Sequence, residues 1–111
     1  MDKYLLKYEG IDEPVGLLSL DFINDEFSIE VNEKYNGSIP SFLRFEDAPM
    51  CIGDRIKLWV LERAPETNYE FIDALIEKAG LSEYDAYGFF KYNNGRFITD
   101  RFYVEPYNKV I

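Results

Sequence analysis

The chain has 111 residues, of which 47% are apolar and 17% aromatic, a size and composition typical of one folded domain and not of a disordered segment. Its formal charge is −9, and no part of it forms the basic stripe that binds phosphate backbones, so we expect no direct nucleic-acid contact. A single cysteine, the lack of a secretory leader pattern, and the lack of any apolar run near the roughly 18 residues of a membrane span predict one cytoplasmic domain over residues 1–111, without membrane contact.

The N-terminal part carries three strand-like segments separated by turns. Residues 4–8 are rich in strand formers, and a turn separates them from a second apolar run over residues 15–22. After a polar turn, Phe27, Ile29 and Val31 alternate with polar residues in the two-residue period of a half-buried strand. We expect three antiparallel strands here, with the side chains of Ile29 and Val31 buried.

The middle of the chain changes to a helical period. Residues 38–50 hold two prolines, Phe42 and Phe45 without a clean period, which predicts a packed connection. From Asp54 to Arg63, apolar residues recur at three- and four-residue intervals, and Pro65 stops the pattern. This spacing predicts a first helix over about 54–63, with Trp59 buried on its inner face.

A second and a third helix are expected before a final strand. Thr67 or Asn68 can cap the second helix, and Gly80 supplies its left-handed C-terminal position. The apolar stripe of this helix consists of Phe71, Ile72, Leu75, Ile76 and Ala79. Ser82 with Asp85 resembles a capping box and predicts the start of a third helix, which ends by residues 93–95.

The last segment, from Phe97 to Pro106, is rich in β-prone residues and predicts a strand that returns to the sheet. The complete order is then β-β-β-α-α-α-β. This order predicts an α+β fold, in which a small antiparallel sheet packs against about three short helices.

No catalytic, metal or cofactor site is expected from the residue types. The chain has no histidine, one cysteine and no glycine-rich phosphate loop. With 21 carboxylates, some pair will lie close by chance, so a glycosidase-like pair has little support. The segment from Asp21 through Asp25 to Glu26 could coordinate calcium, but it lacks the glycine and the distal glutamate of an EF-hand, and a solvated hairpin turn is the favoured interpretation.

Two surfaces are candidates for binding a partner. Residues 1–50 hold 11 acidic and 4 basic residues, so the N-terminal half is the electronegative end. The expected partner-binding residues are Asp21, Asp25, Glu26, Glu30 and Glu33. An exposed aromatic patch at Tyr84, Tyr87 and Tyr92 is the alternative, because a short helix cannot bury all of these together with two phenylalanines.

A series of spaced residues in the C-terminal half resembles a known module. The series consists of Trp59-x3-Arg63-x-Pro65, Leu75, Gly80-Leu81, Tyr84-Asp85, Gly95 and Asp100-x-Phe102-x-Val104. It is similar to a small module of Firmicutes and their mobile elements that often lies beside, or is fused to, HipA-like serine/threonine kinases. The likeness covers about half the chain, and Phe102-Tyr103 stands where the module has a Tyr-Trp pair. It implies a fold and a genomic neighbourhood and carries over no catalytic residue.

Two functions follow as hypotheses, and both depend on protein binding. The first is a non-catalytic partner or regulator of a larger bacterial or phage protein with a basic surface, such as a HipA-like kinase. The second is a phage or plasmid anti-defence inhibitor, similar to an anti-CRISPR, whose carboxylates mimic nucleic-acid phosphates. The sequence also leaves a homodimer open, because an edge strand and spare aromatic residues could pair with a second copy.

Overall fold

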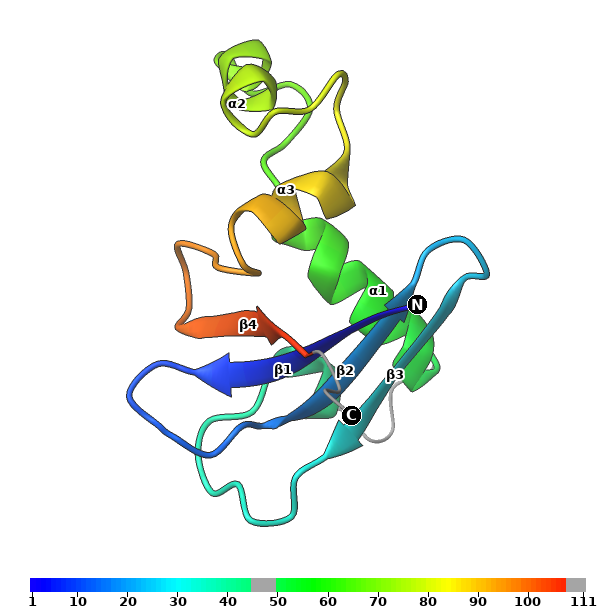
Figure 1. The fold of residues 1–111 in the computed structure, drawn as a ribbon, viewed down its shortest axis with the longest axis vertical. Helices are drawn as coiled ribbons and strands as arrows, with labels where there is room; N and C mark the ends of the chain where they lie inside the picture. The colour runs from blue at the N-terminus through cyan, green and yellow to red at the C-terminus, as the bar shows by residue number, and fades with distance from the viewer. Residues whose placement is uncertain (45–49, 108–111) are drawn as a thin grey trace.

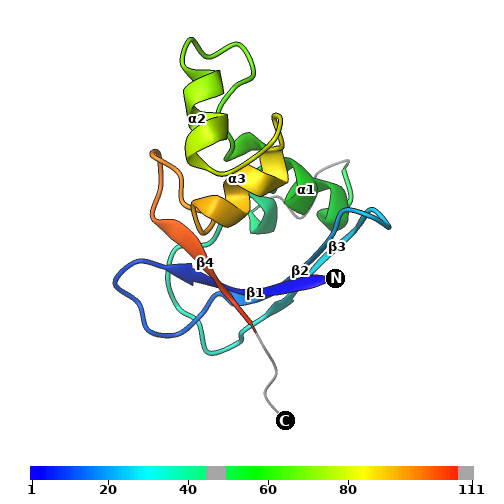
Figure 2. The same cartoon turned by 45° about the horizontal axis from the view of Figure 1, so that its top comes forward.

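The computed structural model describes residues 1–44 and 50–107. A four-stranded antiparallel sheet forms one layer (Figure 1), and Figure 2 shows the helices gathered on one side of it. Three strands precede the helices and the fourth follows them, which confirms the predicted α+β fold and its element order. No helix in the described stretches is long and apolar enough to cross a membrane.

The sheet has the strand order β3-β2-β1-β4. The central strand β1 (Asp2–Tyr8) pairs with β2 (Gly16–Asp21) on one side and with β4 (Phe102–Pro106) on the other. Within the described part of the chain, the strand β3 (Glu26–Val31) pairs with β2 alone. Strands β3 and β4 are therefore the two edges of the sheet.

Alternate side chains of the strands point toward the helices and form the core. Leu6 on β1, and Leu18 and Leu20 on β2, are buried almost completely. On β3 the same face carries Phe27, Ile29 and Val31, but burial falls along the strand until Val31 is 50% exposed. The prediction of a buried Val31 is wrong. The two-residue period identifies which face of the sheet the side chain is on, but burial also requires another element to pack over that position.

The first helix, α1 (Ile52–Glu62), begins two residues before the predicted start. On this helix, the side chain of Trp59 is 6% exposed and packs edge-on against three aromatic rings, which confirms the predicted burial. These rings, with their centroid distances, are Phe42 at 5.3 Å, Phe90 at 6.3 Å and Phe102 at 6.4 Å. Phe42 lies in a short 3-10 turn, η1 (Ser41–Leu43), within the predicted packed connection, while Phe45 falls outside the described residues.

The second helix, α2 (Ile72–Lys78), is shorter than predicted and projects from the body of the molecule (Figure 1). Thr67 and Asn68 do not cap it, because they lie in a turn closed by the hydrogen bond from the Tyr69 amide to the Glu66 carbonyl. Its C-terminal end matches the prediction. Gly80 has a φ of 73°, and the amides of Gly80 and Leu81 bond to the carbonyls of Glu77 and Ile76, the paired hydrogen bonds of a Schellman motif.

The third helix, α3 (Ala86–Tyr92), begins at its N-cap Asp85, so the capping box predicted from Ser82 is wrong. Ser82 lies in a bend between two elements: the Schellman turn of α2 ends at Leu81, and α3 begins only at Ala86. The predicted strand start at Phe97 is also wrong. Residues 97–99 lie in a loop in which Phe97 is half-buried and Ile98 is 96% exposed, and β4 begins only at Phe102.

Candidate protein-binding surface

In the hairpin between β2 and β3, the carboxylate of Asp21 points into the turn. One of its oxygens accepts the backbone amides of Ile23 at 3.1 Å and Asn24 at 3.0 Å, and the other accepts the Asn24 side-chain amide at 2.9 Å. The bonds from Asn24 hold the pKa of Asp21 below its ordinary value, because they stabilise the ionised form. The residue is only 8% exposed, so its role is to shape the turn and it is not part of the accessible acidic surface.

The next acidic residue of the hairpin, Asp25, is joined to the first helix. It has a φ of 55°, and its Oδ1 lies 2.6 Å from Nζ of Lys57 on α1. The Asp25 side chain is 63% exposed, and an exposed ion pair of this kind contributes only about 0–1 kcal/mol. Lys57 nevertheless compensates the charge of Asp25, so this carboxylate adds little to the local negative potential. With Asp21 and Asp25 held in these contacts, the segment has the geometry of the favoured hairpin turn.

The other three predicted residues are exposed carboxylates without an ion pair among the described residues. Glu26 and Glu30 lie on β3, and Glu33 follows the end of that strand. Positions four apart on a strand share a face, so Glu26 and Glu30 both point away from the helices, about 13 Å apart along the chain. The structure thus brings two of the five predicted residues onto one strand face, and places Glu33 just beyond it.

The β4 edge of the sheet is closed by the chain itself. The Phe102 amide donates to Asp100 at 3.0 Å, and the Phe102 carbonyl accepts from the Arg63 guanidinium at 3.1 Å. Two residues later the Val104 amide donates to the Asn94 carbonyl at 2.8 Å. Pro106 then ends the strand with no amide hydrogen to offer. We call this the closed edge.

The β3 edge is open over its second half. The Asn32 amide bonds to the Val15 carbonyl at 2.9 Å, which fixes the even-numbered residues as those that bond to β2. The amides and carbonyls of Ile29 and Val31 therefore point outward, and no described residue bonds to them. At Phe27 the helix α1 approaches closely, with the Phe27 carbonyl 3.0 Å from the position that a Cβ on Gly53 would occupy. We call Ile29 and Val31, with the solvent-facing Glu30 between them, the open edge.

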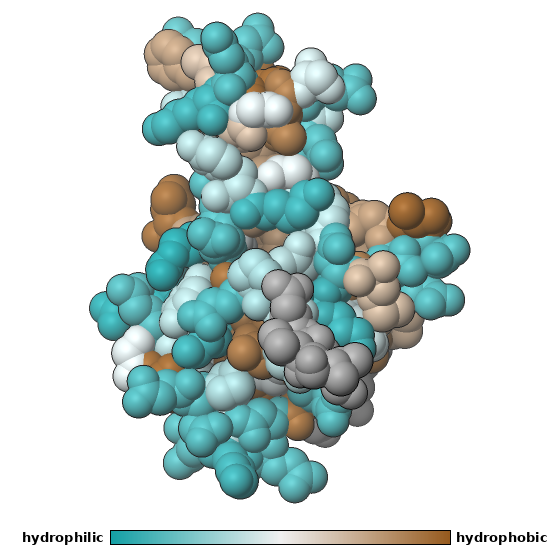
Figure 3. Space-filling model, viewed as in Figure 1, coloured by the Kyte–Doolittle hydropathy of each residue, from teal (hydrophilic) through white to brown (hydrophobic). Residues whose placement is uncertain are grey.

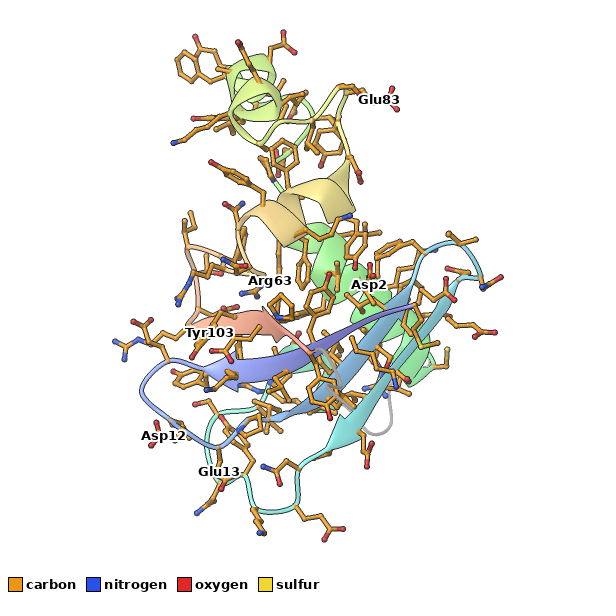
Figure 4. All side chains as sticks on the ribbon, in the orientation of Figure 1. Asp2, Asp12, Glu13, Arg63, Glu83 and Tyr103 are labelled. Atoms are coloured by element: carbon orange, nitrogen blue, oxygen red, sulfur yellow. The ribbon has the colours of Figure 1, made fainter. Side chains whose placement is uncertain are left out.

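A buried arginine, whose structural role the sequence did not predict, joins the end of α1 to β4 (Figure 4). Arg63 is 5% exposed, forms two 2.7 Å bonds to Asp100, and also donates to the Gly95 carbonyl. Its guanidinium lies 4.2 Å from the centroid of the Trp59 ring. Burial of Asp100 opposes ionisation, but the bonds from Arg63 and the Phe102 amide outweigh it and lower the pKa of Asp100.

These contacts give a structural meaning to much of the motif series. The side chains of Trp59, Arg63 and Asp100 meet at one place, with the Gly95 and Phe102 carbonyls beside them. Arg63 also forms the C-cap of α1, a position at which a cation is favourable. Its bidentate partner is 37 residues away, a separation that no local pattern reveals.

The tyrosines of the expected aromatic patch mostly turn inward, so the patch does not form as expected. The Tyr84 hydroxyl donates to the Pro65 carbonyl at 2.7 Å, and the Tyr87 hydroxyl lies 2.8 Å from that of Tyr4 and 2.5 Å from an Asp2 oxygen. Burial and these hydrogen bonds raise the pKa of Tyr87. Of the three tyrosines, only Tyr92 is largely exposed, at 47%.

One region of apolar exposure lies around α2, where Tyr69, Phe71 and Ile98 are exposed. A cleft of about 590 Å³ lies between this helix and the loop before β4, and its apolar lining includes Tyr69, Leu75, Phe97 and Ile98. No side chain of α2 is fully buried, so the predicted stripe is only partly covered. In Figure 3, brown apolar side chains show between polar ones on this projecting part of the molecule. The helical period had identified the stripe correctly, but it carries no information about what covers it.

No group of three or more metal-ligating side chains occurs within residues 1–44 and 50–107. Comparisons with protein-family models, with curated proteins and with solved structures found no match to this chain. The resemblance to the kinase-associated module is therefore a hypothesis that depends on the quoted motif alone.

Proposed function

We propose that this chain is a non-catalytic protein-binding module, a partner or regulator of a larger protein that presents a basic surface. One observation carries the proposal: Glu26 and Glu30 are exposed on one strand face without a described ion-pair partner, and Glu33 is exposed in the turn that follows the strand. Uncompensated carboxylates at a protein surface raise the rate of encounter with a basic partner and help to set its orientation.

The motif series names the first class of partner to try, the HipA-like kinases. We also propose that the protein acts in the cytoplasm, because Cys51 is a free, exposed thiol of the kind that a reducing compartment preserves. The proposal involves no cofactor and no direct nucleic-acid contact.

The second hypothesis, an anti-defence inhibitor that mimics nucleic acid, uses the same carboxylates and the same net charge of −9. The two hypotheses differ in the normal role of the partner surface that this chain covers. An inhibitor would cover a surface that binds nucleic acid, whereas a regulator would cover one that does not. If a short DNA or RNA duplex competes with this chain for the partner, the inhibitor is favoured. If the partner has no affinity for either duplex, the regulator is favoured.

The experiment compares the wild-type chain with a charge-reversed variant, Glu26→Lys, Glu30→Lys and Glu33→Lys, against candidate kinases and against proteins identified from a host lysate. A matched control carries Glu66→Lys, Glu70→Lys and Glu77→Lys, which changes the net charge equally at exposed positions around α2. We expect the first variant alone to lose at least about tenfold in association rate and to lose most of its salt dependence. Equal loss in both variants, or loss in neither, would reject the β3 surface.

A further inference from the structure

The contrast between the two edges of the sheet points to a way of binding as well as to a surface. An edge strand with unpaired backbone groups is a template on which another chain can add a strand. The closed edge is a poorer template, since Asp100 and the Asn94 carbonyl accept its outward amides, Arg63 binds the Phe102 carbonyl, and Pro106 has no amide hydrogen. The open edge offers the amides and carbonyls of Ile29 and Val31.

The helix α1 limits how long an added strand could be. Gly53 approaches the Phe27 carbonyl so closely that a single Cβ there would lie 3.0 Å from the oxygen. Burial falls in the other direction, from Phe27 at 9% exposed to Val31 at 50% exposed. The accessible length therefore runs from Ile29 through Val31, which fits a short strand of about three to five residues.

The side chains along the open edge specify the chemistry of that strand. Glu30 and Ser28 project from the face away from the helices, while Ile29 and Val31 project from the face toward them. Directly opposed side chains on neighbouring strands lie about 4.5–5.5 Å apart, so opposite charges across the new pair are favourable. A strand that alternates basic and apolar residues would place a cation beside Glu30 and an apolar side chain beside Val31.

A second copy of this chain is a poor occupant of the open edge, because the charge of Glu30 would oppose the pairing. An antiparallel pairing that used the outward groups of both Ile29 and Val31 would centre on Glu30 and set this residue directly opposite its counterpart. Like charges in directly opposed positions are destabilising. The carboxylate therefore discriminates against self-pairing while it favours a basic strand.

We propose that the open edge of β3 accepts a short extended segment of the partner, with alternating basic and apolar residues, as a fifth antiparallel or parallel strand. This inference rests on the proposed function and adds its structural mode. The interface would contain main-chain hydrogen bonds from Ile29 and Val31, with specificity supplied by Glu30 on one face and Val31 on the other.

The test uses a synthetic nine-residue peptide in which lysine and valine alternate, with a peptide of alternating glutamate and valine as its matched control. Binding is followed by amide hydrogen exchange, read by NMR on the full chain. We expect the Lys-Val peptide alone to slow exchange at the Ile29 and Val31 amides by at least about tenfold. Failure of that peptide to bind at millimolar concentration, or binding without protection at these two amides, would overturn the proposal.

A backbone variant separates this mode from ordinary charge attraction. Val31→Pro removes an outward amide that β2 does not use, at an edge position where proline is tolerated, and Val31→Thr keeps that amide in a similar shape. We expect about five- to tenfold weaker peptide binding for the proline variant and little change for the threonine variant. Equal binding by both would overturn strand addition. If the Glu26, Glu30 and Glu33 variant still bound the partner protein poorly in that case, the proposed function would stand without this mode.

Discussion

At the β4 edge of the sheet, two side chains and a loop carbonyl bind the outward amides of Phe102 and Val104 and the Phe102 carbonyl, and the proline that ends the strand has no amide hydrogen. At the β3 edge, in contrast, the amides of Ile29 and Val31 bond to none of the described residues. The closed edge is β4, the strand with which the chain returns to the sheet after its helices, and Arg63 joins this strand to the end of α1. Among the described residues, only the carboxylates of the open edge oppose its pairing with another chain. The contrast indicates that one edge stabilises the fold, while the other is kept available at little cost to stability.

The largest expected effect is at the closed edge. Arg63→Ala would leave Asp100 partly buried without its cation and two carbonyls without a donor, and breaking a buried ion pair on one side costs about 3–5 kcal/mol. Urea unfolding measures the loss, with Arg96→Ala, a half-exposed arginine, as the control that should change stability little. A urea midpoint for Arg63→Ala equal to that of the control would show that the contacts of the closed edge do not stabilise the fold.

The other half of this ion pair adds a pH dependence. The folded state lowers the pKa of Asp100, so its stabilisation is complete above the unfolded value of about 3.9 and is lost as the pH falls through the lower folded value. Asp100→Asn should cost about 1.5–3 kcal/mol at neutral pH, the range for a hydrogen bond to a charged group. Its unfolding free energy should also fall less than that of the wild type on acidification below pH 4. Asp21 would supply the remaining slope, because its pKa shifts in the same direction.

Much of this architecture could be predicted from the sequence. Strand-forming residues and turns predicted the first two strands, and the two-residue period predicted the third. The helical period predicted a buried Trp59, and the end of an apolar stripe predicted Gly80 in the left-handed region. Each of these features depends on neighbours within a few residues along the chain.

The rest of the structure depends on contacts that are distant in sequence. The partner of Arg63 is 37 residues away, and the exposure of Val31 depends on where α1 stops covering β3. For the candidate site, composition identified the acidic half of the chain. It could not separate Asp21, held inside its turn, from Glu30, which faces solvent, because both are carboxylates next to apolar residues.

A third prediction concerns the strand that supports the open edge. A Cβ on Gly16 of β2 would lie 2.5 Å from the Glu30 carbonyl oxygen, so Gly16→Ala forces the two backbones apart. Overpacking of this kind costs about 1–3 kcal/mol, and here it should also loosen the Val31 end of β3. Thermal unfolding measures the cost. Ser28→Ala, an exposed change on the same strand pair, should leave the midpoint unchanged, and equal midpoints for the two variants would show that β2 and β3 are not held closely there.

The smallest expected effect is at the open edge itself. Glu26→Gln and Glu30→Gln should each change the unfolding free energy by no more than about 0.5 kcal/mol, because neither carboxylate has a described partner to lose. Asp21→Asn, in contrast, alters a carboxylate that accepts three hydrogen bonds and should destabilise the chain measurably. A loss at Glu30 as large as the loss at Asp21 would assign the strand carboxylate a structural role in place of a binding role.

Amide hydrogen exchange of the free chain tests the contrast between the edges most directly. Exchange rates vary across a structure with the hydrogen bonding of each amide, from unprotected groups to those that open only on global unfolding. We predict that the amides of Ile29 and Val31 exchange at least about tenfold faster, relative to their unfolded rates, than those of Phe102 and Val104 on the closed edge. Equal protection at the two edges would mean that β3 is already covered in solution, and would contradict the account.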